Sequence, residues 1–387
     1  MFYINTLPAE YIEPWAVSLE NRLNSLYSSD RRIAYFYEKP DCSTFRYRVY
    51  NMIQTIQDMD GISATYFCLE EINYLHSILD SINVLVICRA RYTISLNSLI
   101  ARAKNKGVKV LFDLDDLVFN TQKIDLILHT LDQDFNQEGV WDHWFAYIGR
   151  IGALLKLCDG CITTNTYLGD QVKEYHDIKT MTIPNFLNQE QLAISNKILK
   201  EKLESHFQRT DTIYIGYFSG TPTHNKDFAI VVESLIKLLE QDKRIRLLIV
   251  GYLELPDSIK KFDDRIEVYP LHDFVNLQRL MSLVEINIVP LQNNKFTNCK
   301  SELKFFEASI VGTLTIASPT FTYKSAINNA KNGFISNDYE WSEVLSKAMD
   351  TLENGEYEQM IRKAHSDTLN KYAWYNQKNL LKELMDF

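Results

Sequence analysis

Two lysines, a serine and a glutamate lie close together in the segment Lys300–Ser318, KSELKFFEASIVGTLTIAS. Lys300, Lys304 and Glu307 are spaced four and then three residues apart, so on a helix they would share one face, with Ser301 beside them. Cations and free backbone donors at a helix start stabilise phosphate oxygens, and a carboxylate one or two turns later can hold a ribose diol. The segment therefore suits a sugar nucleotide, which carries both groups. The alternative is an amphipathic helix whose lysines are solvated.

The end of this segment resembles a known enzyme family. Gly312 would close the helix, and Leu314–Ala317 would form the next strand. The run Glu307–Ser318, EASIVGTLTIAS, resembles the signature of retaining glycosyltransferases of the group-1 (family 4) class, which have two Rossmann-like domains in the GT-B arrangement. The resemblance implies that Glu307 binds the ribose of the donor.

One position departs from that signature. Many members of the family have an earlier glutamate eight positions before the second, where this chain has Cys299. The Lys300-Ser301-x-x-Lys304 variant occupies the segment instead, and it resembles a subgroup that acts on surface polysaccharides. The resemblance therefore implies sugar transfer for polysaccharide assembly, but it does not carry over a mechanism that needs two glutamates.

Length and composition restrict the class of protein. With 387 residues, the chain is long enough for two or three domains. Its apolar content of 46% is enough for sizeable cores, and its net charge of −9 argues against an extended nucleic-acid interface. The first ten residues lack a basic segment followed by an apolar core, and no apolar run approaches the roughly 18 residues of a membrane-spanning helix. We therefore expect a cytoplasmic protein that binds no nucleic acid, and contact with the inner face of a membrane stays open.

Six cysteines lie mostly in or beside apolar runs, at positions 42, 68, 88, 158, 161 and 299. Cys158 and Cys161 form a lone C-x-x-C motif, whereas a zinc site would need a second pair. A redox role would want a helix start after the first cysteine, and this motif lies in strand-like sequence. Buried free thiols are the favoured interpretation.

Strand-like and helix-like segments alternate through the first half of the chain. The strand candidates are Arg32–Tyr37, Asn83–Cys88, Val108–Leu114, Gly160–Thr164 and Lys179–Ile183, and the helix candidates are Ser95–Lys106, Ala146–Leu157 and Tyr167–Tyr175. Buried apolar runs separated by helices predict a parallel sheet that is covered by helices on both faces.

The same alternation restarts in the second half. Its strand candidates are Ile213–Phe218, Arg246–Val250, Ile266–Tyr269 and Ile286–Val289, and its helix candidates are Asp227–Gln241, Asp257–Lys261 and Phe274–Leu283. Between the two series lie Pro184 and the polar stretch Asn188–Arg209, which predict a domain boundary near residue 185. We expect an α/β protein with two Rossmann-like domains that face each other across a cleft, over residues 1–185 and 186–370. The resemblance places the acceptor on the first domain and the nucleotide sugar on the second, and it implies that residues 371–387 form a helix that crosses back to the first.

The loop after the first strand of the second half is a candidate phosphate site, because ligands collect at the carboxyl ends of parallel strands. It contains Ser219, Gly220, Thr221, His224 and Lys226. The glycine lets the backbone approach a phosphate, the hydroxyls supply donors, and the lysine adds a charge near the start of the next helix. The resemblance implies a basic pair for the diphosphate here, of which Lys226 supplies one member. A plain polar loop is the alternative.

The loop after the first strand of the chain offers a second group of polar residues. Ser43, Thr44, Arg46 and Arg48 stand where the family usually has a glycine-rich loop. They could bind anionic groups on the acceptor side, or they could form a solvated helix start.

Charged residues also follow the next two strands. Arg89 directly follows the strand Asn83–Cys88. A cation at the end of a buried strand is costly unless an anion or a carboxylate lies beside it. Arg89 could therefore form an ion pair with Asp115 or Asp116, or it could bind the substrate. Asp113 and Asp115 form a D-x-D, in which two carboxylates can share a divalent cation with a diphosphate. The resembled family generally works without a metal, and the resemblance implies that Asp115 and Asp116 orient the sugar or the acceptor hydroxyl.

Together, the residues and the resemblance predict a retaining glycosyltransferase. It would move a hexose or deoxyhexose from a nucleotide-diphosphate sugar to a saccharide or lipid-linked saccharide in surface polysaccharide assembly, without a cofactor. Lys226 and Lys304 would stabilise the leaving diphosphate, Glu307 would hold the ribose, and Asp116 would act at the acceptor. The expected donor contacts are Ser219, Gly220, Thr221, His224, Lys226, Lys300, Ser301, Lys304 and Glu307, and the expected cleft residues are Arg46, Arg48, Arg89, Asp115 and Asp116. Two alternatives stay open: a metal-dependent transferase that uses Asp113 and Asp115, and a catalytically silent partner subunit that kept the fold.

Overall fold

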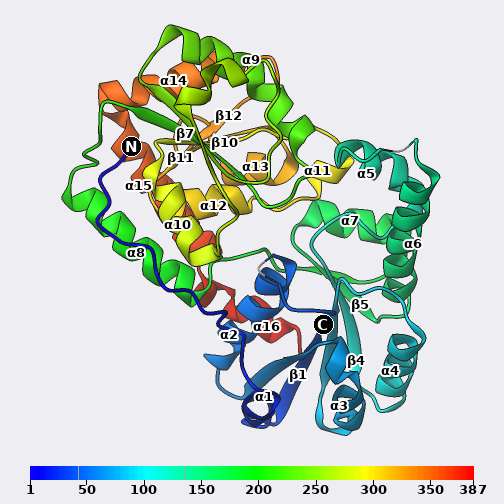
Figure 1. Cartoon of the computed structure of the whole chain (residues 1–387). Helices are drawn as coiled ribbons and strands as arrows, with labels where there is room; N and C mark the ends of the chain where they lie inside the picture. Colours follow the sequence, from blue (N-terminus) through cyan, green and yellow to red (C-terminus); the bar gives the residue numbers. More distant parts are fainter. Residues whose placement is uncertain (42, 135) are drawn as a thin grey trace.

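The computed structural model describes residues 1–41, 43–134 and 136–387. These residues form two lobes, each built around a parallel six-stranded sheet (Figure 1). The strand order is β2-β1-β3-β4-β5-β6 in the first sheet and β12-β11-β10-β7-β8-β9 in the second. The prediction of an α/β protein with two parallel sheets is confirmed.

The first lobe holds β1 to β6 and α1 to α7. Its strands are β1 Arg31–Phe36, β2 Ile62–Phe67, β3 Val84–Cys88, β4 Lys109–Leu114, β5 Gly160–Thr163 and β6 Thr180–Thr182. Its helices are α1 Leu19–Leu26, α2 Asn51–Gln57, α3 Ile72–Ser77, α4 Ile94–Asn105, α5 Ile124–Thr130, α6 Glu138–Leu155 and α7 Thr166–Tyr175. A π-helical turn, Arg46–Tyr50, leads into α2, and short 3-10 turns cover Leu69–Glu71, Leu79–Ser81 and Thr121–Lys123.

The second lobe repeats this alternation with β7 to β12. Its strands are β7 Ile213–Ser219, β8 Ile245–Gly251, β9 Ile266–Tyr269, β10 Ile286–Val289, β11 Leu314–Ala317 and β12 Phe334–Ile335. Its helices are α8 Gln189–Glu204, α9 Asn225–Gln241, α10 Phe274–Leu283, α11 Lys295–Asn298, α12 Leu303–Ile310, α13 Phe321–Ala326, α14 Trp341–Asn354 and α15 Glu356–Tyr372. The 3-10 turns Lys260–Arg265 and Trp374–Gln377 and the last helix, α16 Lys378–Glu383, complete the description.

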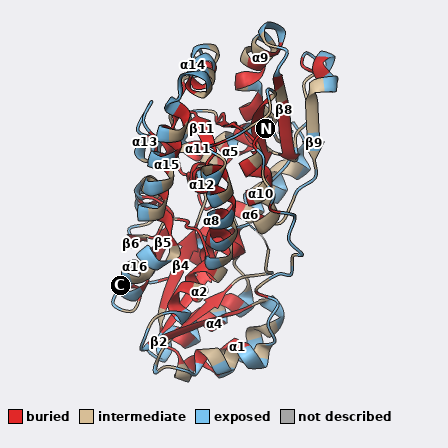
Figure 2. Cartoon of the chain, turned by 90° about the vertical axis from the view of Figure 1, so that its left-hand side faces the viewer, coloured by how far each residue is buried: buried red, intermediate tan, exposed pale blue. Residues whose placement is uncertain are grey.

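The central strands are continuous apolar runs because helices cover both faces of each sheet. All five residues of β3 and all seven of β7 are buried, and Figure 2 shows inner strands such as β4, β8 and β11 in the colour of buried residues, whereas the edge strand β9 is partly exposed. Burial of such β-branched and aromatic side chains contributes roughly 25 cal/mol for each Å² removed from water, and it fixes the sheets as rigid supports. The loops at their ends are therefore held in place.

Each sheet has one position where the direction of chain progression reverses. In the first sheet β2 and β3 flank β1 on opposite sides, and in the second sheet β8 and β10 flank β7 in the same way. Loops that follow the two strands at such a reversal diverge and leave a crevice between them. The residues after β1, β3, β7 and β10 are therefore the ones that the topology places at a binding position.

The polar stretch Asn188–Arg209, which the sequence analysis used only to predict a domain boundary, is mostly helical. It contains the helix α8, whose first turn is capped by the Asn188 side chain, which accepts from the backbone N–H of Gln191. The buried positions of α8 recur every three or four residues and pack on α10 and α12. The polar residues between them hid this period in the sequence.

The first residues of the chain pack on the second lobe, whereas the predicted boundary assigned them to the first. Phe2 contacts the rings of Phe207 and Tyr357 at centroid distances of 5.9 and 5.7 Å, and Thr6 donates to Glu201. The chain then enters the first lobe at Trp15 and α1. At the other end, α16 packs against α2 of the first lobe, and Lys378 pairs with Asp58.

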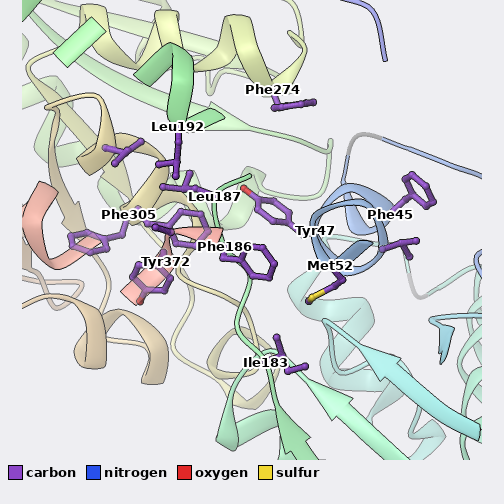
Figure 3. Packing of buried hydrophobic residues seen from close by; sticks show 14 of the residues in the cluster. Phe45, Tyr47, Met52, Ile183, Phe186, Leu187, Leu192, Phe274, Phe305 and Tyr372 are labelled. Carbon is purple, nitrogen blue, oxygen red and sulfur yellow. The ribbon is translucent and has the colours of Figure 1, made fainter. Parts of the chain in front are cut away.

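Both lobes share one apolar cluster, seen in Figure 3. Phe45, Tyr47 and Met52 come from the first lobe, and Phe274 and Phe305 come from the second. Trp15 stacks on Phe274 across the junction at 6.1 Å. Because the two lobes are joined by buried contacts, the residues at their facing edges lie at defined distances from each other.

Four of the described cysteines, Cys88, Cys158, Cys161 and Cys299, are buried free thiols, as predicted, and Cys68 is half-buried. Cys42 lies outside the described residues. No helix among the residues that the structure describes is both long and apolar enough to cross a bilayer.

Candidate active site

A cavity of about 610 Å³ lies between the two lobes at the carboxyl ends of both sheets. The first lobe contributes the segment after β1 and one residue after β4, namely Ser43, Thr44, Arg46, Tyr47 and Asp115. The second lobe contributes the loop after β7 and one face of α12, namely Ser219, Gly220, Thr221, His224, Lys304 and Glu307. The structure thus brings most of the predicted donor residues together around one space.

Lys304 supplies a positive charge to this cavity. It lies on the first turns of α12, and its ammonium stands 5.3 Å from the centroid of the Tyr217 ring. No carboxylate among the described residues lies within ion-pair distance of it. Burial lowers the pKa of Lys304 to about 8; the charge of Asp227 acts against this shift, and the charge of Lys300 adds to it. A partly buried cation that has no counter-charge among the described residues is a ready site for an anion.

Glu307 lies one turn further along α12, and its side chain is only 3% exposed. Its Oε1 accepts hydrogen bonds from Tyr47 Oη, from Arg46 Nη2 at 3.3 Å and from Gln191 Nε2 at 3.3 Å. Oε2 accepts none from the part of the chain that the structure describes. The carboxylate is therefore fixed from three sides, with one oxygen left for a ligand.

Lys300 and Ser301 are not on the same helix as Lys304, in contrast to the sequence prediction. The helix α12 begins only at Leu303, so both residues stand on the turn before it. Lys300 Nζ lies 3.6 Å from Asp116 Oδ2, and both residues line a cavity of about 150 Å³ beside the larger one, together with Ser301. Gly312 closes the helix with φ +71°, as its position predicted.

Lys226 does not fit the predicted phosphate contact. It lies in the first turn of α9 and lines neither of these cavities, nor a further one at the lobe junction that is described below. Its ammonium donates to the carbonyl of His129 at 2.8 Å and pairs with Asp132 at 3.3 Å, both on the first lobe. Proximity in sequence to the β7 loop suggested a donor contact, but the helix directs this side chain across the lobe junction.

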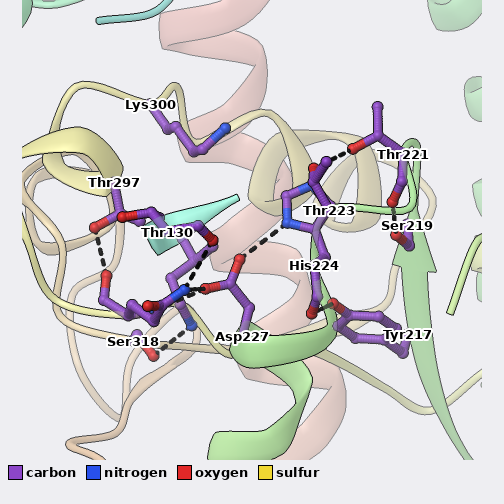
Figure 4. A network of polar contacts seen from close by, with 12 residues as sticks. Thr130, Tyr217, Ser219, Thr221, Thr223, His224, Asp227, Thr297, Lys300 and Ser318 are labelled. Atoms are coloured by element: carbon purple, nitrogen blue, oxygen red, sulfur yellow. Dashed lines mark hydrogen bonds and ion pairs between the residues drawn. The ribbon is translucent and has the colours of Figure 1, made fainter. Parts of the chain in front are cut away.

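His224, in the same loop, does line the cavity and is held by a residue that the sequence analysis missed. Its Nδ1 lies 2.9 Å from Oδ2 of Asp227 (Figure 4). Asp227 is 2% exposed, and its Oδ1 accepts from the backbone N–H and the side-chain amide of Gln292. The i,i+3 spacing of His224 and Asp227 at a helix start was the signal that could have revealed this pair.

Arg48 and Asp113 form a buried ion pair, so neither is available as a cleft residue. Both are at most 1% exposed, and Arg48 donates to the two carboxylate oxygens of Asp113 at 2.8 and 2.9 Å. Arg48 also donates to the carbonyl of Ile183. The prediction of a cleft role for Arg48 is therefore wrong.

The same pair bears on the metal-dependent alternative. Both carboxylate oxygens of Asp113 accept hydrogen bonds from Arg48. Oδ1 of Asp115 lies 2.9 Å from Arg89 Nη1, and its Oδ2 accepts from Thr44 Oγ1 at 2.6 Å. The two carboxylates of the D-x-D thus serve separate cationic or hydroxyl partners instead of converging on one point. The expected ion pair of Arg89 with Asp115 is present, and its geometry favours a structural role for both.

A second cavity, of about 600 Å³, adjoins the first and shares Ser43, Thr44, Thr221 and His224 with it. Its wall on the first lobe includes the aromatic side chains of Tyr37, Trp144 and Tyr147 and the cations Arg89 and Arg91. Asp116 lies on its border, and Oδ1 of this residue is buried with no hydrogen-bond partner in the part of the chain that the structure describes. A buried carboxylate oxygen of this kind is costly unless a ligand hydroxyl or amide donates to it.

Comparison with known families supports the assignment of the second lobe. Residues 212–354 match the family described as glycosyl transferases group 1. This segment covers β7 to α14 and includes the loop with His224 and the helix with Lys304 and Glu307. No curated protein matches the sequence. Residues 212–354 are thus similar to a group 1 glycosyltransferase domain, and the chain is an enzyme of the glycosyltransferase class.

Solved structures of similar architecture cover nearly the whole chain. HepE of Anabaena, in complex with UDP and glucose, is 10% identical, with a TM-score of 0.61 over 92% of this chain and 99% of that one. A glycosyltransferase from Rickettsia africae is 15% identical, with a TM-score of 0.61 over 93% and 99%. Sucrose-phosphate synthase of Thermosynechococcus elongatus is 13% identical, with a TM-score of 0.60 over 92% and 98%. At these identities the likeness concerns the fold, which is the GT-B arrangement.

Proposed function

We propose that the chain is a retaining glycosyltransferase that moves a hexose or deoxyhexose from a nucleotide-diphosphate sugar to a saccharide acceptor in surface polysaccharide assembly. The observation that carries this proposal is the cavity between the lobes, where Lys304, a cation without an ion-pair partner among the described residues, stands one turn before a fixed carboxylate, Glu307. The structural neighbour HepE, solved with UDP and glucose and with UDP-glucose, supports a nucleotide sugar as the donor.

On the donor side, the diphosphate would lie between Lys304 and the loop Ser219–Thr221. Gly220 has open space where a Cβ would stand, so a phosphate can approach the backbone closely there. The leaving diphosphate gains negative charge as the glycosidic bond breaks, and a preorganised cation stabilises that charge more than it stabilises the ground state. Glu307 would accept hydrogen bonds from the ribose through its free oxygen.

On the acceptor side, the second cavity offers a surface for a saccharide. Trp144 and Tyr147 provide aromatic faces, and the unpartnered Oδ1 of Asp116 would accept a hydrogen bond from the hydroxyl that attacks the sugar. The two cavities meet at His224 and Thr221, where donor and acceptor would come into contact. We propose that the acceptor is a saccharide or lipid-linked saccharide, and that the enzyme is cytoplasmic and works at the inner face of the membrane.

The first prediction concerns the donor. Thermal unfolding of the protein with UDP, GDP, ADP and dTDP should show stabilisation by at least one of them, because a ligand at 100 times its dissociation constant adds about 2.7 kcal/mol. The matching nucleotide sugar with a saccharide acceptor should then give a product with the donor's anomeric configuration, read by NMR, in the presence of EDTA. Binding without turnover for any sugar would favour the silent partner subunit, and loss of activity with EDTA would favour the metal-dependent alternative.

The second prediction concerns Glu307. Wild-type protein should bind a nucleoside diphosphate more tightly than its 2′,3′-dideoxy analogue, because the carboxylate accepts from the ribose hydroxyls. In Glu307→Gln this preference should shrink by about tenfold, which corresponds to about 1.4 kcal/mol for one charged hydrogen bond. Glu190→Gln is the matched control, since Glu190 accepts from Tyr50 and Gln54 outside the cavity. An unchanged preference in Glu307→Gln would remove the ribose assignment.

A further inference from the structure

We propose that His224, held by Asp227, binds the donor diphosphate as an imidazolium, so that the site takes up a proton when the donor enters. The inference rests on the proposed function and adds a specific role for one side chain of that site. According to this inference, the positive charge that the loop after β7 contributes to diphosphate binding comes from His224 and not from Lys226.

The hydrogen bond to Asp227 decides which nitrogen of His224 faces the cavity. Asp227 Oδ1 is occupied by Gln292, and Oδ2 lies 2.9 Å from His224 Nδ1. A carboxylate can only accept, so Nδ1 carries a proton and Nε2 is the remaining nitrogen. In the neutral ring Nε2 presents a lone pair, which repels a phosphate oxygen. In the imidazolium it donates a hydrogen bond, and the charge strengthens that bond.

The position of His224 suits this role. It is the residue before α9, and it lines the large cavity, the second cavity and the small cavity beside Asp116. Its side chain is 14% exposed. Figure 4 shows the ring between Asp227 on one side and Thr221 and Thr223 on the other. The ring therefore stands where the donor and acceptor cavities meet, beside the group that leaves.

The charges around the ring set its protonation in the empty site. Lys304 approaches from the first turn of α12 and Lys300 from the turn before it, and Asp227 lies in the first turn of α9, directly after the ring. Asp115 and Asp116 line neighbouring cavity walls from the loop after β4, and Glu307 lines the large cavity from α12. Burial lowers the pKa of His224, the bond with Asp227 opposes this, and the two lysines lower it further. The ring of the empty site is therefore neutral near pH 7.

A bound diphosphate changes this balance. Its negative charge offsets Lys304 and Lys300 and favours the charged form of the ring, so it raises the pKa of His224. By linkage, a group whose pKa is higher in the complex takes up a proton on binding. Between the two pKa values the dissociation constant should rise with pH, by at most tenfold for each pH unit. Binding should therefore weaken as the pH increases through this window.

The experiment is calorimetry at pH 7 with the nucleoside diphosphate that stabilises the protein best among UDP, GDP, ADP and dTDP. Measured binding enthalpies in buffers of different ionisation enthalpy give the number of protons taken up. The wild type should take up a fraction of a proton more than His224→Gln, whose amide keeps a donor but does not titrate. Because both proteins bind the same ligand, protonation of the ligand itself cancels in the comparison. His143→Gln, an exposed histidine on α6, is the control and should behave as the wild type.

A second variant tests the role of Asp227. Asp227→Asn removes the charge that favours the imidazolium, so proton uptake should fall towards the value of His224→Gln, and the dissociation constant should rise. Equal proton uptake by the wild type and His224→Gln would overturn the inference and leave the proposed function intact. If none of the four nucleotides binds the wild type, the proposed function fails and this inference fails with it.

Discussion

The described side chains at the lobe junction are of two kinds: Glu307 and His224 are held by partners, and Lys304 is not. Glu307 and His224 are each held by partners that orient them, Arg46 and Tyr47 for the first and Asp227 for the second. Lys304 has no such ion-pair partner among the described residues, and burial keeps the pKa of its ammonium near 8. The site is thus preorganised for an anion, because its dipoles and charges need little rearrangement when the ligand arrives.

The third prediction follows from this pKa. Lys304 is protonated below pH 8 in the free enzyme and loses its charge as the pH rises through that value. We expect kcat/KM to fall above about pH 8, since kcat/KM reports the free enzyme. Lys304→Arg should move this fall to higher pH because the guanidinium stays charged. Lys304→Met should lower kcat by about 10²- to 10³-fold at pH 7. If kcat/KM of Lys304→Arg still fell above about pH 8, the fall would have to come from the titration of another group.

At the scale of elements, the π-helical turn Arg46–Tyr50 is the feature that builds the first-lobe wall. Arg48 anchors this turn to the end of β4 through Asp113, and the neighbouring Arg46 and Tyr47 then reach Glu307 on α12. Turns of this kind occur often at functional sites, because the extra residue redirects side chains. The buried pair therefore positions the site without touching the cavity itself.

The fourth prediction tests that anchor. Asp113→Asn should lower the free energy of unfolding by about 3 to 5 kcal/mol, because it leaves the buried Arg48 without its counter-charge. Asp80→Asn is the matched control: Asp80 pairs with Lys106 on the surface, and such pairs contribute about 0 to 1 kcal/mol. Urea unfolding measures both. Equal losses in the two variants would contradict the anchoring role of Asp113.

At the scale of the whole molecule, the packing of the lobes decides which cations face the donor. Lys226 on α9 contacts the carbonyl of His129 and the side chain of Asp132 at the end of α5, so its ammonium lies outside the cavity. The apolar cluster that both lobes share sets the distance between them. Because the site is divided between the lobes, we expect the lobes to move relative to each other when substrates enter and products leave.

The fifth prediction compares two lysines of the second lobe. Lys226→Met removes a half-exposed interlobe pair worth about 0 to 1 kcal/mol, so the donor dissociation constant should change by less than about fivefold. Lys304→Met should weaken donor binding more than Lys226→Met, measured by the same calorimetry. A larger loss in Lys226→Met would mean that Lys226 reaches the diphosphate in the complex.

The sequence determined the features that depend on local patterns. Apolar runs such as Asn83–Cys88 and Ile213–Phe218 predicted their strands to within one residue, and Gly312 predicted the end of α12. The motif Glu307–Ser318 indicated the enzyme class before any geometry was known. The strands and the helix end follow from side-chain periodicity and backbone preference, which a short segment contains by itself, whereas the enzyme class followed from the resemblance of this motif to a known family.

Only the tertiary structure decided the direction and the partners of the charged side chains. Arg48 is buried against Asp113, Lys226 turns to the first lobe, and His224 is held by Asp227. The first two contacts join elements that lie next to one another only after the sheets have formed and the lobes have packed. The pair of His224 and Asp227 is local, but only the packing of the lobes encloses it beside the cavity. A charge can be read from the sequence, but its surroundings, which fix its pKa and its role, are set by contacts between distant parts of the chain.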